Sequence, residues 1–172
     1  LLATNESWQN QCIAEAKIFA QKKPSYQDLL ELKTIDACLN ETMRLYPAGW
    51  AFTRMAVEDD TIKNYHIKAG DLLLICPYLS HRDSKYWNNT QQFNPERFLS
   101  DNENAIDRFV FYPFGAGPRT CLGMTMGLME MKSIILEILA NHKFKMNGAL
   151  PIPDARATIY SRNGFAVSIE KQ

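Results

Sequence analysis

The sequence has no excess of charge of either sign and no long apolar run. Lysine plus arginine and aspartate plus glutamate each total 19 in 172 residues, so no net field exists to attract nucleic acid or an anionic membrane surface. The longest apolar run near the middle of the chain, residues 72–76, is far shorter than the ~20 residues that span a bilayer. We therefore expect no nucleic-acid partner and no membrane span within these residues.

Cysteine and histidine are also scarce, with four cysteines and three histidines. The chain has no CxxC pair and no Cys/His cluster of the kind that binds zinc, and it is too large to need disulfide staples. His66, His81 and His142 share no ligand spacing, and single histidines are usually surface or core residues. We therefore expect no zinc site and a reduced, intracellular environment.

An initiator methionine, a basic start and a cleavable signal pattern are absent as well, which is typical of a sequence that begins within a longer protein. The expected location is cytoplasmic, or membrane-associated if a preceding N-terminal segment anchors the protein.

The pattern of the chain changes from helical to mixed, without repeats. Residues 1–47 are expected to be helical, with one helix that begins after Asn5 and stops before Pro24, and another that starts at about Tyr26 or Lys33 and is ended by Pro47. Residues 51–79 alternate like strands between turn signals and predict a small antiparallel sheet.

The second half predicts fewer regular elements. We expect an irregular meander and cysteine loop over residues 84–121, a helix over residues 122–141, and a closing hairpin over residues 157–170 whose strands, "ATIYS" and "FAVSIE", meet across Arg162-Asn163-Gly164. The predicted fold class is mainly α with small antiparallel β-sheets (α+β), and residues 1–172 form part of one domain. An irregular segment of this length inside a compact domain usually has a function.

That segment ends in "PFGAGPRTCLGM", residues 113–124. Gly115 and Gly117 permit a tight loop whose backbone can approach a large, flat ligand. Cys121 then falls at the start of the next helix, where free amides and the helix dipole stabilise a thiolate. Arg119 supplies a cation that suits carboxylates. The alternative is a glycine loop that only caps a helix, with Cys121 as a small core residue.

Three motifs along the chain resemble those of the cytochrome P450 superfamily, in the order that the family has them. They are Glu-x-x-Arg at Glu41 and Arg44, Pro-Glu-Arg-Phe at residues 95–98, and the haem-binding signature Phe-x-x-Gly-x-Arg-x-Cys-x-Gly at Phe114, Gly117, Arg119, Cys121 and Gly123. The resemblance covers essentially the whole chain, but it corresponds only to the C-terminal part of the family domain.

The resemblance implies a role for each matched residue. Cys121 would be the axial thiolate ligand of haem b (iron protoporphyrin IX), in a loop that includes Phe114, Gly115, Gly117 and Gly123. Arg54 and Arg119 would meet the haem propionates, and Glu41, Arg44 and Arg97 would form a buried structural cluster. Taken without the resemblance, Glu41 and Arg44 predict a surface ion pair, and Arg54 predicts a solvated strand residue.

The resemblance further implies a monooxygenase that inserts one oxygen atom of O2 into an apolar organic substrate, because a thiolate ligand favours O–O cleavage at haem iron. Electrons would come from NAD(P)H through a reductase or ferredoxin. The implied substrate-pocket residues, which are also candidates for the core, are Ala48, Trp50, Ala51, Phe52, Thr158 and Ile159.

The family's central helix, with its proton-relay residues, has no counterpart in these 172 residues. We therefore expect the missing N-terminal part of the domain to be a partner, and the chain alone to be incomplete and inactive. Two alternatives stay open: a haem-thiolate peroxygenase, isomerase or dehydratase, and a non-catalytic haem-binding fragment.

Overall fold

The computed structural model describes residues 1–19, 23–99 and 106–172. Its helices are η1 (Leu2–Thr4), α1 (Glu6–Phe19), α2 (Tyr26–Leu30), α3 (Lys33–Leu45), α4 (Pro77–Ser80), η2 (Pro95–Phe98), η3 (Gly117–Arg119) and α6 (Met124–Asn141). Its strands are β1 (Phe52–Met55), β2 (Asp60–Ile62), β3 (Tyr65–Ile67), β4 (Leu72–Ile75), β5 (His142–Met146), β6 (Pro153–Ala155), β7 (Ile159–Ser161) and β8 (Val167–Lys171). This mixture of helices and small antiparallel sheets confirms the predicted α+β class.

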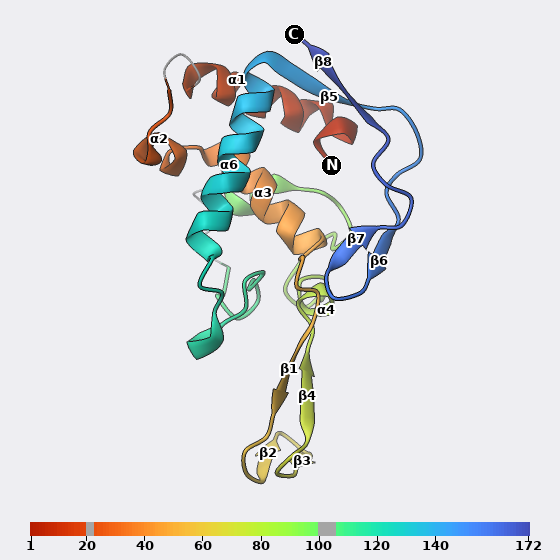
Figure 1. Cartoon of the computed structure of the whole chain (residues 1–172). Coiled ribbons are helices and arrows are strands. Elements are labelled where there is room, and N and C mark those ends of the chain that lie inside the picture. The colour runs from red at the N-terminus through yellow and green to blue at the C-terminus, as the bar shows by residue number, and fades with distance from the viewer. Residues whose placement is uncertain (20–22, 100–105) are drawn as a thin grey trace.

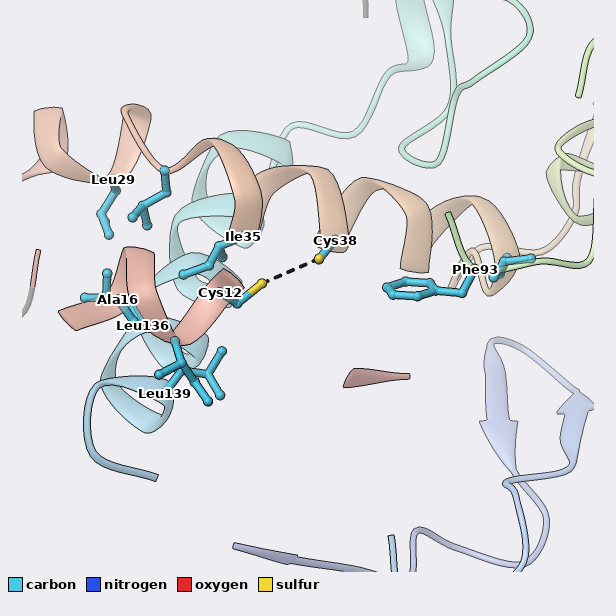
Figure 2. Close-up of a cluster of buried hydrophobic side chains, with 11 residues drawn as sticks. Cys12, Ala16, Leu29, Ile35, Cys38, Phe93, Leu136 and Leu139 are labelled. Carbon is cyan, nitrogen blue, oxygen red and sulfur yellow. Dashed lines mark hydrogen bonds between the residues drawn. The ribbon is translucent and has the colours of Figure 1, made fainter. Parts of the chain in front are cut away.

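The main core lies where α1, α3 and α6 pack together (Figure 1). Each helix contributes apolar residues from one face, as its spacing predicts, and Figure 2 shows Cys12, Ile35, Leu136 and Leu139 converging from the three helices. The Sγ atoms of Cys12 and Cys38 are 3.5 Å apart. The hydrogen bond with Cys12 and then burial raise the pKa of the Cys38 thiol, so Cys38 packs as a protonated core residue.

The N-terminus of α3 is capped from another helix. Its own N-cap residue, Leu32, has no side chain able to accept a hydrogen bond. Instead, the Glu15 carboxylate on α1 accepts the amides of Lys33, Thr34 and Ile35, at 2.9, 2.9 and 2.8 Å. One carboxylate therefore satisfies three of the amides that a helix start leaves free, and it ties α1 to α3.

Gln9 makes a similar link from α1 to β5. Its side-chain oxygen accepts the backbone N–H of Phe144 at 2.6 Å, and its side-chain nitrogen donates to the Phe144 carbonyl at 3.1 Å. Gln9 is itself buried, and its amide satisfies the backbone of Phe144 as another strand would.

The region predicted as one small sheet forms two antiparallel ribbons. Strands β1 and β4 pair with Phe52 opposite Ile75, and β2 pairs with β3. Figure 1 shows the β1–β4 ribbon extending away from the helices, with β2 and β3 at its tip; we call residues 52–75 the arm. The strands stop at Ile75, short of the predicted end at residue 79, because Pro77 begins α4 and cannot donate to a ladder.

The predicted closing hairpin over residues 157–170 is wrong in its pairing. Strand β7 pairs with β6, and β8 pairs with β5. The chain does turn at Gly164, which has a φ of 71°. However, Asn163 accepts the Ile152 amide at 2.7 Å and donates to the Leu150 carbonyl at 3.1 Å. These bonds hold the turn against the segment before β6. The turn therefore connects β7, in one sheet, to β8, in another.

Candidate functional site

The cysteine loop is closed by its own backbone. The Gly115 amide donates to the Tyr112 carbonyl at 2.9 Å, and the Cys121 amide donates to the Phe114 carbonyl at 3.0 Å. Gly115 and Gly117 have φ values of 76° and 73°, which residues other than glycine rarely adopt. The loop leaves the Cys121 thiol exposed and free of any disulfide.

Helix α6 begins at Met124, two residues later than predicted, with Gly123 as its N-cap. The Met124 amide donates to the Cys121 carbonyl at 3.3 Å, so Cys121 lies just before the first turn. A Cβ at Gly123 would lie 3.8 Å from the Cys121 Sγ, and one at Gly127 would lie 3.9 Å from the Phe114 ring. Both are ordinary contacts, so the protein's own atoms do not require glycine at these positions.

A cleft of about 650 Å³ separates the cysteine loop from β1. Phe114, Gly115, Arg119 and Cys121 line its loop side. The other side is made by the turn before β1 and by β1 itself, including Ala48, Gly49, Phe52, Thr53, Arg54 and Met55. Alternation along the strand puts Phe52 and Arg54 on the same face. The cleft therefore brings together residues that lie more than 60 positions apart in the sequence.

The cleft is cationic and partly apolar. Of the residues that the structure describes, those that line it include two arginines, Arg54 and Arg119, and no aspartate or glutamate. The Arg54 guanidinium lies 4.8 Å from the centre of the Phe52 ring and donates to the Thr53 carbonyl at 2.9 Å. Arg119 is exposed at the end of η3. Two cations in a cleft that also holds the rings of Phe52 and Phe114 suit a flat ligand that carries two carboxylates.

Iron protoporphyrin fits this donor set. Arg54 and Arg119 would pair with its propionates, and the exposed Cys121 thiol would bind its iron as a thiolate. Among residues 1–19, 23–99 and 106–172, no three His, Cys, Asp or Glu side chains group as a metal site. A metal ion beside Cys121 would therefore need further ligands from a bound group, such as a macrocycle supplies.

A buried ionic cluster joins α3 to the segment that follows α4. The Glu41 carboxylate accepts from Arg44 at 2.7 and 2.8 Å, and from Arg97 at 3.4 Å. The Glu41 and Arg44 side chains are 0% exposed. Arg44 also donates to the carbonyls of His81, Thr90 and Gln92. The pair is therefore buried, unlike a surface ion pair, and its satisfied hydrogen bonds offset part of the cost of burying charge.

The sequence is similar to those of known proteins over nearly its whole length. The sequence profile of the family described as Cytochrome P450 matches residues 1–166. The chain belongs to the cytochrome P450 family. It is 35% identical to Thromboxane-A synthase of Rattus norvegicus over 98% of its own length, and 38% identical to Cytochrome P450 3A7 of Homo sapiens over 76%. It spans about a third of the former's length and about a quarter of the latter's.

The residues expected to line a P450 substrate pocket divide into three groups. Ala48 and Phe52 line the cleft that contains Cys121. Trp50 and Ile159 line a neighbouring pocket of about 300 Å³ instead, and Ala51 and Thr158 line neither. The Trp50 ring lies outside the Cys121 cleft, where its indole N–H donates to the Arg156 carbonyl at 2.7 Å.

The P450 sequence motifs gave no role to His81, which is 0% exposed. Its Nε2 accepts the Tyr112 amide at 3.0 Å, although 31 residues separate the two. Burial, helped by Arg44 and Arg82, lowers the pKa of His81 to about 4. No periodic pattern marks such a residue, and the only available signal was a single histidine near the start of an irregular segment. His66, by contrast, lies on the exposed β2–β3 ribbon, and His142 lies at the start of β5.

Proposed function

We propose that this chain is the haem-binding C-terminal part of a cytochrome P450 monooxygenase that inserts one atom of O2 into an apolar organic substrate. The observation that supports the proposal is the cleft, because an exposed cysteine sulfur and two arginines line one cavity. The family match over residues 1–166 supports the same function.

Each residue of the cleft has a distinct part in the proposal. Cys121 would be the thiolate ligand of the iron in haem b. Arg54 and Arg119 would bind the propionates from two sides, so that the ring is fixed in orientation. Phe52 and Phe114 would cover the ring and keep water from the sulfur. The cluster of Glu41, Arg44 and Arg97 would hold α3 to the segment after β4, as a scaffold without a part in the chemistry.

Haem with a thiolate ligand supplies the activation of O2 that attack on C–H bonds requires. The protein residues would only bind and orient the cofactor and shield it. We propose that electrons arrive from NAD(P)H through a reductase or ferredoxin, inside the cell. The N-terminal part of a P450 domain would complete the pocket and supply proton transfer, so the chain alone is expected to be inactive.

The test is the absorption spectrum of the polypeptide reconstituted with haem, reduced and exposed to carbon monoxide. A strongly red-shifted Soret band is expected, because Cys121 would bind the haem iron as a thiolate. Cys121→Ala should lose this band, whereas Cys76→Ala, which removes a half-buried thiol outside the Cys121 cleft, should keep it. A thiolate band in the Cys121 variant would refute the proposal.

A second candidate is a haem-thiolate enzyme that rearranges its substrate without external electrons, such as an isomerase. It is favoured by the relatives named Thromboxane-A synthase, which match 98% of the chain, whereas the match to Cytochrome P450 3A1 covers 76%. The two candidates differ in one measurement. A monooxygenase consumes NAD(P)H in step with product when its reductase is present, and an isomerase turns over without it.

A further inference from the structure

Tyr112, just before the cysteine loop, is held by α4 and the residue after it. Its backbone N–H donates to Nε2 of His81 at 3.0 Å, and its hydroxyl donates to the Ser80 hydroxyl at 2.7 Å. Its own carbonyl accepts the Gly115 amide at 2.9 Å, which closes the first turn of the loop. Tyr112 is thus the point at which the loop that carries Cys121 is attached to the body of the protein.

The His81 ring is held by one hydrogen bond and by contacts with two aromatic rings. Its centre lies 5.2 Å from that of Phe111 and 5.1 Å from that of Tyr112, and its carbonyl accepts Nη1 of Arg44 at 2.8 Å. Because Nε2 accepts a hydrogen bond, the ring hydrogen is on Nδ1. The backbone groups of Met43 and Arg44 act on the pKa of the ring, but Nδ1 has no hydrogen-bond partner among the described residues.

We propose that His81 is a positioning residue for the cysteine loop. The lone pair of its neutral imidazole holds the Tyr112 amide, and through that amide it holds the loop that presents Cys121 to the cofactor. His81 is not among the residues that line the cleft, so it acts through the backbone. The part about the cofactor rests on the proposed function, whereas the hydrogen bond does not.

Protonation of His81 would break this attachment. The imidazolium has two donors and no acceptor, so it would repel the Tyr112 N–H. The charged groups that face the ring are Arg44 from α3 and Arg82 after α4, with Glu41 behind Arg44. Both arginines oppose a further positive charge, and burial lowers the pKa of His81 to about 4. The attachment is therefore intact at neutral pH and is lost as the pH falls toward 4.

The first experiment measures hydrogen exchange of the Tyr112 amide, by NMR, in the longest polypeptide that contains this sequence. His81→Phe keeps a ring but no acceptor, and protection of the amide should fall by about tenfold or more, as for a lost hydrogen bond. His81→Gln keeps an acceptor in reach and should retain protection. Ser80→Ala, which removes only the hydroxyl contact, should also retain it. Equal protection in the wild type and His81→Phe would overturn the proposal.

The second experiment follows the thiolate fraction of the carbon monoxide complex against pH. In the wild type it should fall as the pH drops through about 4, where the folded His81 takes up its proton, and in His81→Gln, which cannot titrate, it should stay level over the same drop in pH. Identical profiles would overturn the positioning role. If no variant binds haem, the proposed function fails, and the exchange measurement still decides the hydrogen bond. If His81→Phe does not fold, the wild type and His81→Gln provide the same comparison.

Discussion

At the scale of single residues, the motifs predicted identities better than orientations. Cys121, Arg54 and Arg119 line one cleft, and the backbone conformation at Gly115 and Gly117 shapes the side of it that the cysteine loop forms. The position of Trp50 was not predictable, since its ring direction depends on a carbonyl 106 residues away. His81 was missed for a similar reason, because its role depends on a partner distant in sequence.

The first residue-scale prediction concerns the buried ion pair. Arg44→Met should lower the free energy of unfolding by about 3–5 kcal/mol, because it leaves the Glu41 carboxylate buried with the more distant Arg97 as its charged partner, beside the Asn94 amide that donates to it at 2.9 Å. Chemical denaturation measures the change. The matched control is Arg162→Met, which removes a mostly exposed partner of Asp154 and should cost less than about 1 kcal/mol. Equal losses in the two variants would show that burial of the pair is not what matters.

The second residue-scale prediction is a dependence of stability on pH. The unfolded His81 imidazole binds a proton near pH 6.5, whereas the folded one binds it only near pH 4. Stability is therefore greatest above pH 6.5 and falls as the pH drops to about 4, by roughly 3 kcal/mol in all. Denaturation at a series of pH values should give a steeper acid limb for the wild type than for His81→Gln. Parallel limbs would exclude this contribution.

At the scale of elements, sequence signals located turns and helix ends, but they did not identify which strands pair or which side chain caps a helix. The Arg162-Asn163-Gly164 turn is present, yet the strands on either side of it pair elsewhere, because pairing depends on segments that the turn residues do not specify. The start of α3 at Lys33 was one of two predicted starts, and its cap could not be predicted, since the carboxylate comes from Glu15, 18 residues earlier.

This cap gives the element-scale prediction. Glu15→Ala should destabilise the fold by about 1–2 kcal/mol, because three amides at the start of α3 lose their acceptor and the favourable charge at the helix N-terminus. Thermal denaturation followed by circular dichroism measures the loss. Glu137→Ala, on the exposed face of α6, should change stability by no more than about 0.5 kcal/mol. A loss at Glu137 as large as that at Glu15 would argue against the cap.

At the scale of the whole molecule, the chain divides into a helical core and an extended arm. Composition predicted neither the separation nor the cleft between the arm and the cysteine loop, because both depend on the path of the chain between distant elements. The arm leaves large apolar side chains exposed, including Met55, Val57, Leu72 and Leu74. Among the described helices, none is long and apolar enough to cross a membrane.

The whole-molecule prediction compares two sheets of this chain. Amides of the β1–β4 ribbon should exchange at least about tenfold faster than those of the β5–β8 ribbon, because an isolated two-stranded ribbon is marginally stable. Strand β5 is instead supported by Gln9. Hydrogen exchange resolved by residue measures both ribbons in one sample of the 172-residue chain. Slower exchange in β1–β4 would show that the arm is stabilised by contacts beyond its own pairing.

The side-chain amide of Gln9 also protects an edge of β5. A strand with an unpaired edge is a template on which another molecule can add a strand, and this is a common start of aggregation. Phe144 lies on such an edge of β5, and Gln9 already occupies both its N–H and its carbonyl. A helix side chain thus blocks the middle of the edge, and intermolecular pairing there would first require α1 to move away.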